Sequence, residues 1–114
     1  MDIYTSRLWL KDPDVYDITI RSGDKMFAPT WDMVMGFKDG KITWFQYQEM
    51  YCDLMWDSWC KNKDYWKRFA ERDRVVFTCF CVDPQICHRS ELARYFTSLN
   101  LGVYQHEIWY RTGK

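Results

Sequence analysis

The sequence predicts a small single α/β domain over residues 1–114, with a mostly parallel sheet of about four strands flanked by helices. Three observations predict this class. Residues 75–79 form an unbroken apolar run with the length of a buried strand. Candidate segments follow the order strand, helices, strand, helix, strand, which favours right-handed crossovers between parallel strands. A chain of 114 residues is long enough for one domain to bury a core without covalent staples.

Two short strands are expected near the N-terminus. Residues 2–8 begin with β-branched and aromatic side chains, and this strand is expected to end near Thr5 or Ser6. Residues 11–14 predict a turn, because proline presets φ and aspartates cap the local backbone. Residues 18–20 (Ile-Thr-Ile) predict the second strand, which residues 21–24 close. Neither strand carries a hairpin signal, so both fit a parallel or mixed sheet.

Two helices are expected in the middle of the chain. Thr30 is a suitable N-cap for residues 31–38, and Asp39-Gly40 ends that helix. Thr43 and Gln46 form the capping-box pattern of a longer helix. Its apolar repeat is Tyr47, Met50, Tyr51, Leu54 and Met55. Four further rings (Trp44, Phe45, Trp56 and Trp59) widen the apolar surface, so this helix is expected to be covered on more than one side.

The remaining elements follow the same reasoning. Residues 65–70 predict a short helix, and the strand at 75–79 follows it. Asp83-Pro84 predicts a turn, after which a helix is expected to begin near Cys87 or His88 and to stop at residues 100–102. Residues 103–109 predict the last strand. The whole arrangement is Rossmann-like.

Composition excludes several functional classes. The chain has 16 basic and 16 acidic residues, which argues against sequence-independent nucleic-acid binding and against a basic membrane-surface face. No apolar run approaches the roughly 20 residues of a membrane span. The N-terminus lacks the pattern of a signal peptide. Five cysteines without such a signal favour reduced thiols and a cytoplasmic location.

The aromatic content is high, with seven Trp, eight Tyr and seven Phe. Such rings usually pack in the core and between helices and sheets. A stacking platform for nucleic-acid bases is the alternative interpretation.

The chemistry-bearing residues gather where strands are predicted to end. Ligands of open α/β sheets sit beyond the carboxyl ends of the strands. Those ends are residues 5–7 (Thr-Ser-Arg), 21–23 and 79–89. The third is the richest, because Cys87, His88 and Arg89 open a helix whose free N–H groups and dipole favour an anion and a thiolate.

Three interpretations of this junction remain open. In the first, Cys87 is a thiolate nucleophile and the most reactive of the thiols. The phosphatase Cys-x5-Arg loop does not fit, because the residue six positions before Arg89 is Asp83. The rival view treats Cys79 and Cys81 as small apolar residues at a strand end.

The second interpretation is a metal site built from Cys79, Cys81, Cys87 and His88. Structural zinc sites usually pair two short knuckles, and adjacent Cys87 and His88 cannot easily face one ion. We therefore expect no metal at this junction, and no stoichiometric zinc.

The third interpretation is non-covalent anion recognition, with Arg89 as a planar fork donor and His88 as a proton-tunable donor. Its rival assigns Arg89 a structural role, in which the guanidinium ties the turn together through backbone carbonyls.

At these residues the chain resembles the domain-of-unknown-function family 488 of bacteria, archaea and phages. The resemblance is carried by Cys79 at a strand end, Asp83-Pro84, and Cys-His-Arg at residues 87–89 opening a helix. Weaker similarities are Tyr4-Thr5-Ser6, residues 27–29, Tyr47, Tyr51 and His106-Glu107. Many members carry a glutamate where this chain has Cys81, which argues against carboxylate-dependent chemistry here. The resemblance implies a compact α/β fold with a pocket at the Cys-His-Arg turn. The short, aromatic-rich form is similar to phage members.

Together these observations predict an anion or phosphate-ligand pocket at that turn, for a nucleotide or a nucleic-acid end. The expected ligand-binding residues are Thr5, Ser6, Arg7, Cys79, Cys81 and Arg89, and the candidate catalytic residues are Cys87, His88 and Arg89. No cofactor and no membrane association are expected. The alternative is a protein-interaction module that uses an exposed aromatic patch and has no catalytic activity. The residues leave open whether the chain is an enzyme.

Overall fold

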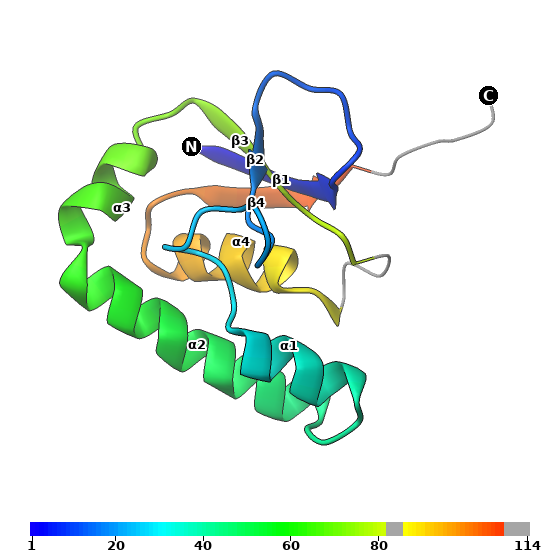
Figure 1. The fold of residues 1–114 in the computed structure, drawn as a ribbon. Coiled ribbons are helices and arrows are strands. Elements are labelled where there is room, and N and C mark those ends of the chain that lie inside the picture. Colours follow the sequence, from blue (N-terminus) through cyan, green and yellow to red (C-terminus); the bar gives the residue numbers. More distant parts are fainter. Residues whose placement is uncertain (82–85, 109–114) are drawn as a thin grey trace, which may run out of the picture.

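Four parallel strands form one sheet in the spatial order β2-β3-β1-β4 (Figure 1). The strands are β1 (Asp2–Arg7), β2 (Val15–Asp17), β3 (Arg74–Cys79) and β4 (Val103–Glu107). The computed structural model describes residues 1–81 and 86–108, and it confirms the predicted α/β class. The predicted turn at Asp83-Pro84 and the end of the last strand at Trp109 lie outside the described residues.

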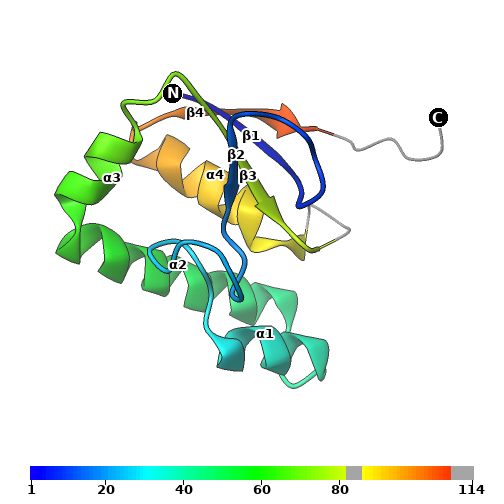
Figure 2. The ribbon, with the colours of Figure 1, turned by 45° about the horizontal axis from the view of Figure 1, so that its top comes forward.

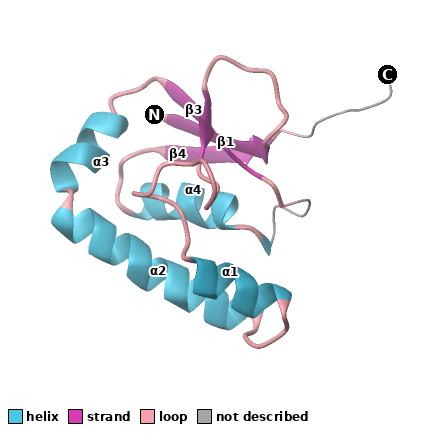
Figure 3. Cartoon of the chain, in the orientation of Figure 1, coloured by secondary structure: helices cyan, strands magenta, loops and turns pink. Residues whose placement is uncertain are grey.

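Four helices accompany the sheet in the described residues, one of them packed directly on its strands. They are α1 (Trp31–Lys38), α2 (Trp44–Lys61), α3 (Lys63–Phe69) and α4 (His88–Ser98). Helix α4 packs against β1, β3 and β4, and α2 crosses the far side of α4 (Figures 1 and 2). Figure 3 shows the long loop that leads from β2 to α1 and carries the chain from the sheet to the helical layer. Within the described residues, no helix is long and apolar enough to cross a membrane.

The predicted helix caps are confirmed. Thr30 Oγ1 accepts a hydrogen bond from the backbone N–H of Met33, 3.2 Å away. Thr43 and Gln46 form the reciprocal capping box, with distances of 2.8 and 3.1 Å. Gly40, just beyond α1, has φ +72°, a conformation that costs glycine little. Sequence patterns at helix ends therefore place α1 and α2 correctly.

The second strand was predicted in the wrong place. The expected strand was residues 18–20, whereas β2 is Val15–Asp17. Asp17 Oδ1 accepts a hydrogen bond from Thr19 N at 2.8 Å, and Gly23 N donates to Thr19 O at 2.9 Å. These local bonds fold the segment into a turn, because an aspartate side chain competes with the sheet for backbone donors. Ile18 is nevertheless fully buried and serves the core.

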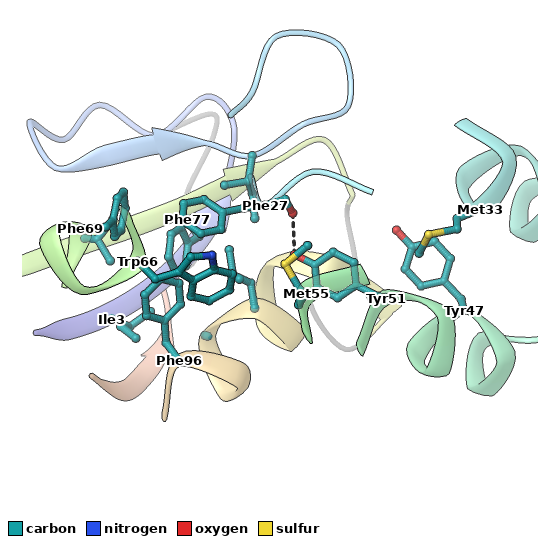
Figure 4. Packing of buried hydrophobic residues seen from close by; sticks show 14 residues of the cluster. Ile3, Phe27, Met33, Tyr47, Tyr51, Met55, Trp66, Phe69, Phe77 and Phe96 are labelled. Atoms are coloured by element: carbon teal, nitrogen blue, oxygen red, sulfur yellow. Dashed lines mark hydrogen bonds between the residues drawn. The ribbon is translucent and has the colours of Figure 1, made fainter. Parts of the chain in front are cut away.

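Aromatic rings build the core (Figure 4). Phe27 lies at its centre, with its ring centroid 5.0 Å from that of Trp66 and 5.6 Å from that of Phe96. The hydroxyl of Tyr51 donates to the backbone carbonyl of Phe27 at 2.6 Å, which satisfies the polar end of a buried ring. Core packing, the first of the two interpretations, thus accounts for a large share of the aromatic residues.

Helix α2 is contacted by α1, α3 and α4, in line with the expectation of cover on more than one side, but its buried residues form one stripe. Its buried residues are Tyr47, Tyr51 and Met55. Phe45 and Trp56 are 67% and 56% exposed. Tyr47, Tyr51 and Met55 recur at four-residue spacing and form one stripe, so a single face of the helix meets the core.

Candidate functional site

Arg89 is fully buried at the start of α4, and its guanidinium is held by the protein itself. Nε and Nη2 donate to the two carboxylate oxygens of Glu107 at 3.0 and 2.8 Å. Nη1 donates to the backbone carbonyl of Cys81 at 2.7 Å and lies 3.2 Å from Cys79 Sγ. These contacts join α4, β4 and the end of β3. The geometry favours the structural interpretation of Arg89, extended by a carboxylate partner.

His88 is also buried, and its ring is fixed by the backbone. Nε2 lies 2.7 Å from the carbonyl oxygen of Ile18, so this nitrogen carries the proton and donates it. Burial lowers the pKa of His88 to about 4, against the opposing effect of the Ile18 carbonyl. The imidazole is therefore neutral near pH 7, and its Nδ1 faces Cys87 Sγ at 3.9 Å. Such a histidine positions the helix start and adds no positive charge to the site.

Three sulfur atoms converge beside these residues. The Sγ atoms of Cys79, Cys81 and Cys87 all lie within 4.8 Å of one another. Cys79 and Cys87 are 1% exposed, and their sulfurs are in bonding contact, although their Cα atoms are 7.9 Å apart. Relaxed disulfides usually join Cα atoms roughly 4.4 to 6.8 Å apart. The backbone thus brings these thiols together at a wider spacing than a disulfide normally has.

The third thiol, Cys81, differs from the other two. The residue is exposed and lines a pocket. Desolvation by the pocket walls raises the pKa of its thiol, while the charges of Arg89 and Lys38 oppose that rise. The charge of Lys38, at the end of α1, therefore affects the pKa of a thiol in the cysteine cluster.

The end of β1 lies beside β3 but contributes less than expected. Thr5 and Ser6 are buried, and their hydroxyls are bound to the Tyr104 hydroxyl at 2.6 Å and to the Ile108 carbonyl at 3.1 Å. Arg7 is aligned with Cys79 in the sheet. Its buried Nε has no hydrogen-bond partner among residues 1–81 and 86–108. None of the three lines the pocket described next.

A pocket of about 480 Å³ opens at the Cys-His-Arg turn. Cys79, Cys81, Cys87 and His88, at the end of β3 and the start of α4, line it. Five aromatic residues, two cations and six other residues line it as well. The aromatic residues are Trp31, Phe37, Trp44, Tyr47 and Phe80, and the cations are Arg21 and Lys38.

The aromatic wall is ordered by its own ring contacts. Trp44 and Tyr47 stack with their centroids 4.9 Å apart and their planes inclined by 20°. Phe37 lies 5.5 Å from Trp44 and 5.9 Å from Tyr47. Trp31 at the start of α1 is 53% exposed, so its ring is accessible to a ligand. The volume and the mixture of apolar walls with a few polar groups match a small-molecule site.

Sequence reasoning brought together Cys79, Cys81, Cys87 and His88, and the structure places these four around one pocket. It missed Glu107 as the partner of Arg89, and it missed Arg21, Lys38 and Trp31 as pocket residues. The signal for Arg21 was its position in residues 21–23, which follow the predicted second strand. No local sequence pattern indicates that α1 lines the pocket, because its position depends on how that helix packs against α2.

Comparison with known proteins places the chain in a family. Residues 2–99 match a family model, DUF488-N3a, described as "Active DUF488-N3 subclade". No curated protein and no solved structure matches the chain. The matched region includes the end of β3, the start of α4 and every residue that lines the pocket. The match covers most of the chain, and the protein therefore belongs to the DUF488 family, within its N3a subclade.

Proposed function

We propose that the protein binds a nucleotide, or the phosphorylated end of a nucleic acid, in the pocket at the Cys-His-Arg turn. The observation that carries this proposal is the combination, within about 480 Å³, of aromatic walls with Arg21 and Lys38. A nucleotide has a flat apolar base and a charged phosphate. The pocket offers one kind of surface for each.

The base is assigned to the aromatic wall. Trp31 is half-exposed and lines the pocket, and the stacked pair of Trp44 and Tyr47 lines it as well. Stacking on an aromatic side chain is worth about 1 to 3 kcal/mol per base and tolerates any base. This mode of binding needs no basic surplus, so it is compatible with the equal acidic and basic counts.

The phosphate is assigned to Arg21 and Lys38. Both are exposed residues that line the pocket, and the charge of Lys38 already acts on the Cys81 thiol. Arg89 is given a positioning role, because its guanidinium is bound to Glu107 and to the Cys81 carbonyl. The anion-binding part of the sequence-based prediction thus moves from Arg89, which does not line the pocket, to two cations that do.

The test is a ligand titration followed by melting temperature and by calorimetry. The ligands are AMP, ATP, adenosine, inorganic phosphate, and short single-stranded DNA with and without a 5′-phosphate. A ligand that binds only the folded state raises the melting temperature by mass action. We expect ATP, AMP or phosphorylated DNA to raise it more than adenosine or phosphate alone, because only these ligands engage both surfaces.

Paired variants locate the binding. Lys38→Gln and Trp31→Ala should each weaken binding by about tenfold or more, through the loss of a charged contact or a stacking contact. Their controls are Lys41→Gln and Trp56→Ala, which change exposed residues that do not line the pocket. Equal responses in each pair, or no response of the wild type to any of these ligands, would refute the proposal.

A protein-interaction module is the second candidate function. It is supported by exposed rings outside the pocket, of which Phe45 and Trp56 on α2 are examples. These two rings are eleven residues apart and are separated on the helix by the charged residues Glu49 and Asp53. If Trp56→Ala changed complex formation while every nucleotide failed to bind, this second function would replace the first.

A further inference from the structure

We propose that the reduced protein binds one thiophilic d10 metal ion, of the Cu(I) class, through the thiolates of Cys79, Cys81 and Cys87. The proposal goes beyond nucleotide binding and stands on different donor atoms. It also differs from the expectation of a metal-free junction, because that expectation considered zinc and counted His88 as a ligand.

The first argument is the convergence of the sulfurs. Cys79 ends β3, Cys81 follows two residues later, and Cys87 precedes α4. Phe80 lies in a bend just beyond β3, and Cys87 is the N-cap residue of α4, so the three cysteines flank the junction between these two elements. The three Sγ atoms lie within 4.8 Å of one another.

The second argument is the size of the cluster. Metal–thiolate bonds are about 2.3 Å long. A planar three-coordinate ion therefore holds its sulfurs about 4 Å apart, by simple trigonometry from that bond length. The three sulfurs already lie within 4.8 Å of one another, and the Cys79 and Cys87 sulfurs, which are in bonding contact, must separate in the reduced protein to reach this spacing. The Cα atoms of Cys79 and Cys87, 7.9 Å apart, favour a bridging atom over a direct bond.

The third argument is charge. Three thiolates around a monovalent cation carry two net negative charges, which the protein must balance. Nη1 of Arg89 lies 3.2 Å from Cys79 Sγ, and Lys38 lines the same pocket as Cys81. The Arg89 charge is shared with Glu107, so the N–H groups at the start of α4 provide additional compensation next to Cys87.

The fourth argument selects the ion. Structural zinc usually has four protein ligands, whereas thiolates alone suit Cu(I), which accepts three of them. His88 is not a fourth donor of this group: Nε2 is bonded to the Ile18 carbonyl, and Nδ1, although 3.9 Å from Cys87 Sγ, does not lie within 4.8 Å of all three sulfurs. Cys79 and Cys87 are shielded from water, while Cys81 is exposed and opens to the pocket. The site thus combines a protected interior with an entry path.

The experiment is an anaerobic titration of reduced protein with Cu(I), in competition with a coloured Cu(I) chelator such as bathocuproine disulfonate. No nucleotide is present, so the result is independent of the proposed nucleotide binding. We expect one Cu(I) per chain. X-ray absorption of the loaded protein should show three sulfur neighbours at about 2.3 Å.

Cysteine variants assign the ligands. Cys81→Ser should lower the affinity at least a hundredfold, and Cys81→Ala should behave alike, while circular dichroism confirms that both remain folded. The matched control is the double variant Cys52→Ser/Cys60→Ser, which removes two exposed thiols outside the cluster and should bind as the wild type does. The proposal is overturned if the wild type does not compete for one equivalent. It is equally overturned if Cys81→Ser retains wild-type affinity or if the control variant loses it.

Discussion

The guanidinium of Arg89 and the carboxylate of Glu107 form a two-pronged ion pair inside the protein. The side chains are 0% and 7% exposed, and the two N–O distances are 3.0 and 2.8 Å. This pair connects the first turn of α4 to the last residue of β4. Because this carboxylate accepts hydrogen bonds from both Nε and Nη2, the side chain of Arg89 has a structural role beside the pocket.

Replacing Arg89 should therefore cost stability in the absence of any ligand. Arg89→Lys keeps the charge but loses the planar fork, so it cannot satisfy Glu107 and the Cys81 carbonyl together. We expect a loss of about 2 to 4 kcal/mol in the free energy of unfolding, since breaking a buried pair leaves unpaired polar groups. Urea denaturation at pH 7 measures it.

The matched control is Arg94→Lys on the same helix. Arg94 pairs with Glu91 through a side chain that is 56% exposed, and exposed pairs contribute at most about 1 kcal/mol. A loss for Arg89→Lys no larger than that of the control would show that the buried pair does not hold α4 in place.

A second ion pair should make stability depend on pH in the acid range. Nη1 of Arg74 donates to both oxygens of Asp12 at 2.8 and 3.0 Å, which lowers the pKa of Asp12 below its ordinary value of 3.8. A carboxyl group with a lowered pKa stabilises the folded state above its unfolded pKa, and this contribution disappears as pH falls through the folded pKa. Asp12→Asn should thus be less stable than the wild type at pH 7, and the difference should shrink below about pH 4.

The measurement is urea denaturation of both proteins at several pH values between 7 and 3. Asp57→Asn serves as the control, because Asp57 pairs with Lys61 through side chains that are 59% and 71% exposed. We expect little change in stability from that substitution at pH 7. A constant difference between Asp12→Asn and the wild type at every pH would contradict the role assigned to Arg74.

The rate of thiol labelling should depend on how exposed each cysteine is. The sequence instead predicted the highest reactivity for Cys87, at the start of a helix. Cys52, Cys60 and Cys81 are exposed, whereas Cys79 and Cys87 are 1% exposed. We expect iodoacetamide to modify the three exposed residues in the folded, reduced protein, with Cys81 requiring higher pH because its pKa is raised. Cys79 and Cys87 should react only after unfolding, as site-resolved mass spectrometry can show. Modification of Cys87 before Cys52 would restore the activated-nucleophile interpretation.

Local signals in the sequence were sufficient for the elements that surround the site. The Thr43–Gln46 capping box and the apolar run that becomes β3 were recognisable because their chemistry is contained within a few residues. The start of α4 at His88 followed from the same kind of reasoning. The strand predicted at residues 18–20 failed because the Asp17 side chain binds the backbone of Thr19, a competition that β-propensity does not include.

Long-range partners were beyond sequence reasoning. Glu107 is 18 residues from Arg89, and their contact depends on the placement of β4 beside β1 at the sheet edge. Lys38 reaches the cysteine cluster only because α1 packs along α2. Charge and residue type led to the prediction of an anion site at the strand ends, and the proposal that Lys38 and not Arg89 binds the anion rests on the tertiary contacts.

The last prediction separates the architectural and the binding roles at the pocket. Lys38 is exposed and lines the pocket, so Lys38→Gln should leave the melting temperature of the free protein almost unchanged and should weaken the stabilisation produced by ATP. Arg89→Lys should do the opposite: a lower melting temperature without ligand, and a stabilisation by ATP close to that of the wild type. Melts of the three proteins over a range of ATP concentrations test both expectations together. If Arg89→Lys abolishes the response to ATP while Lys38→Gln preserves it, the anion is bound by Arg89, and the assignment of the phosphate to Arg21 and Lys38 is wrong.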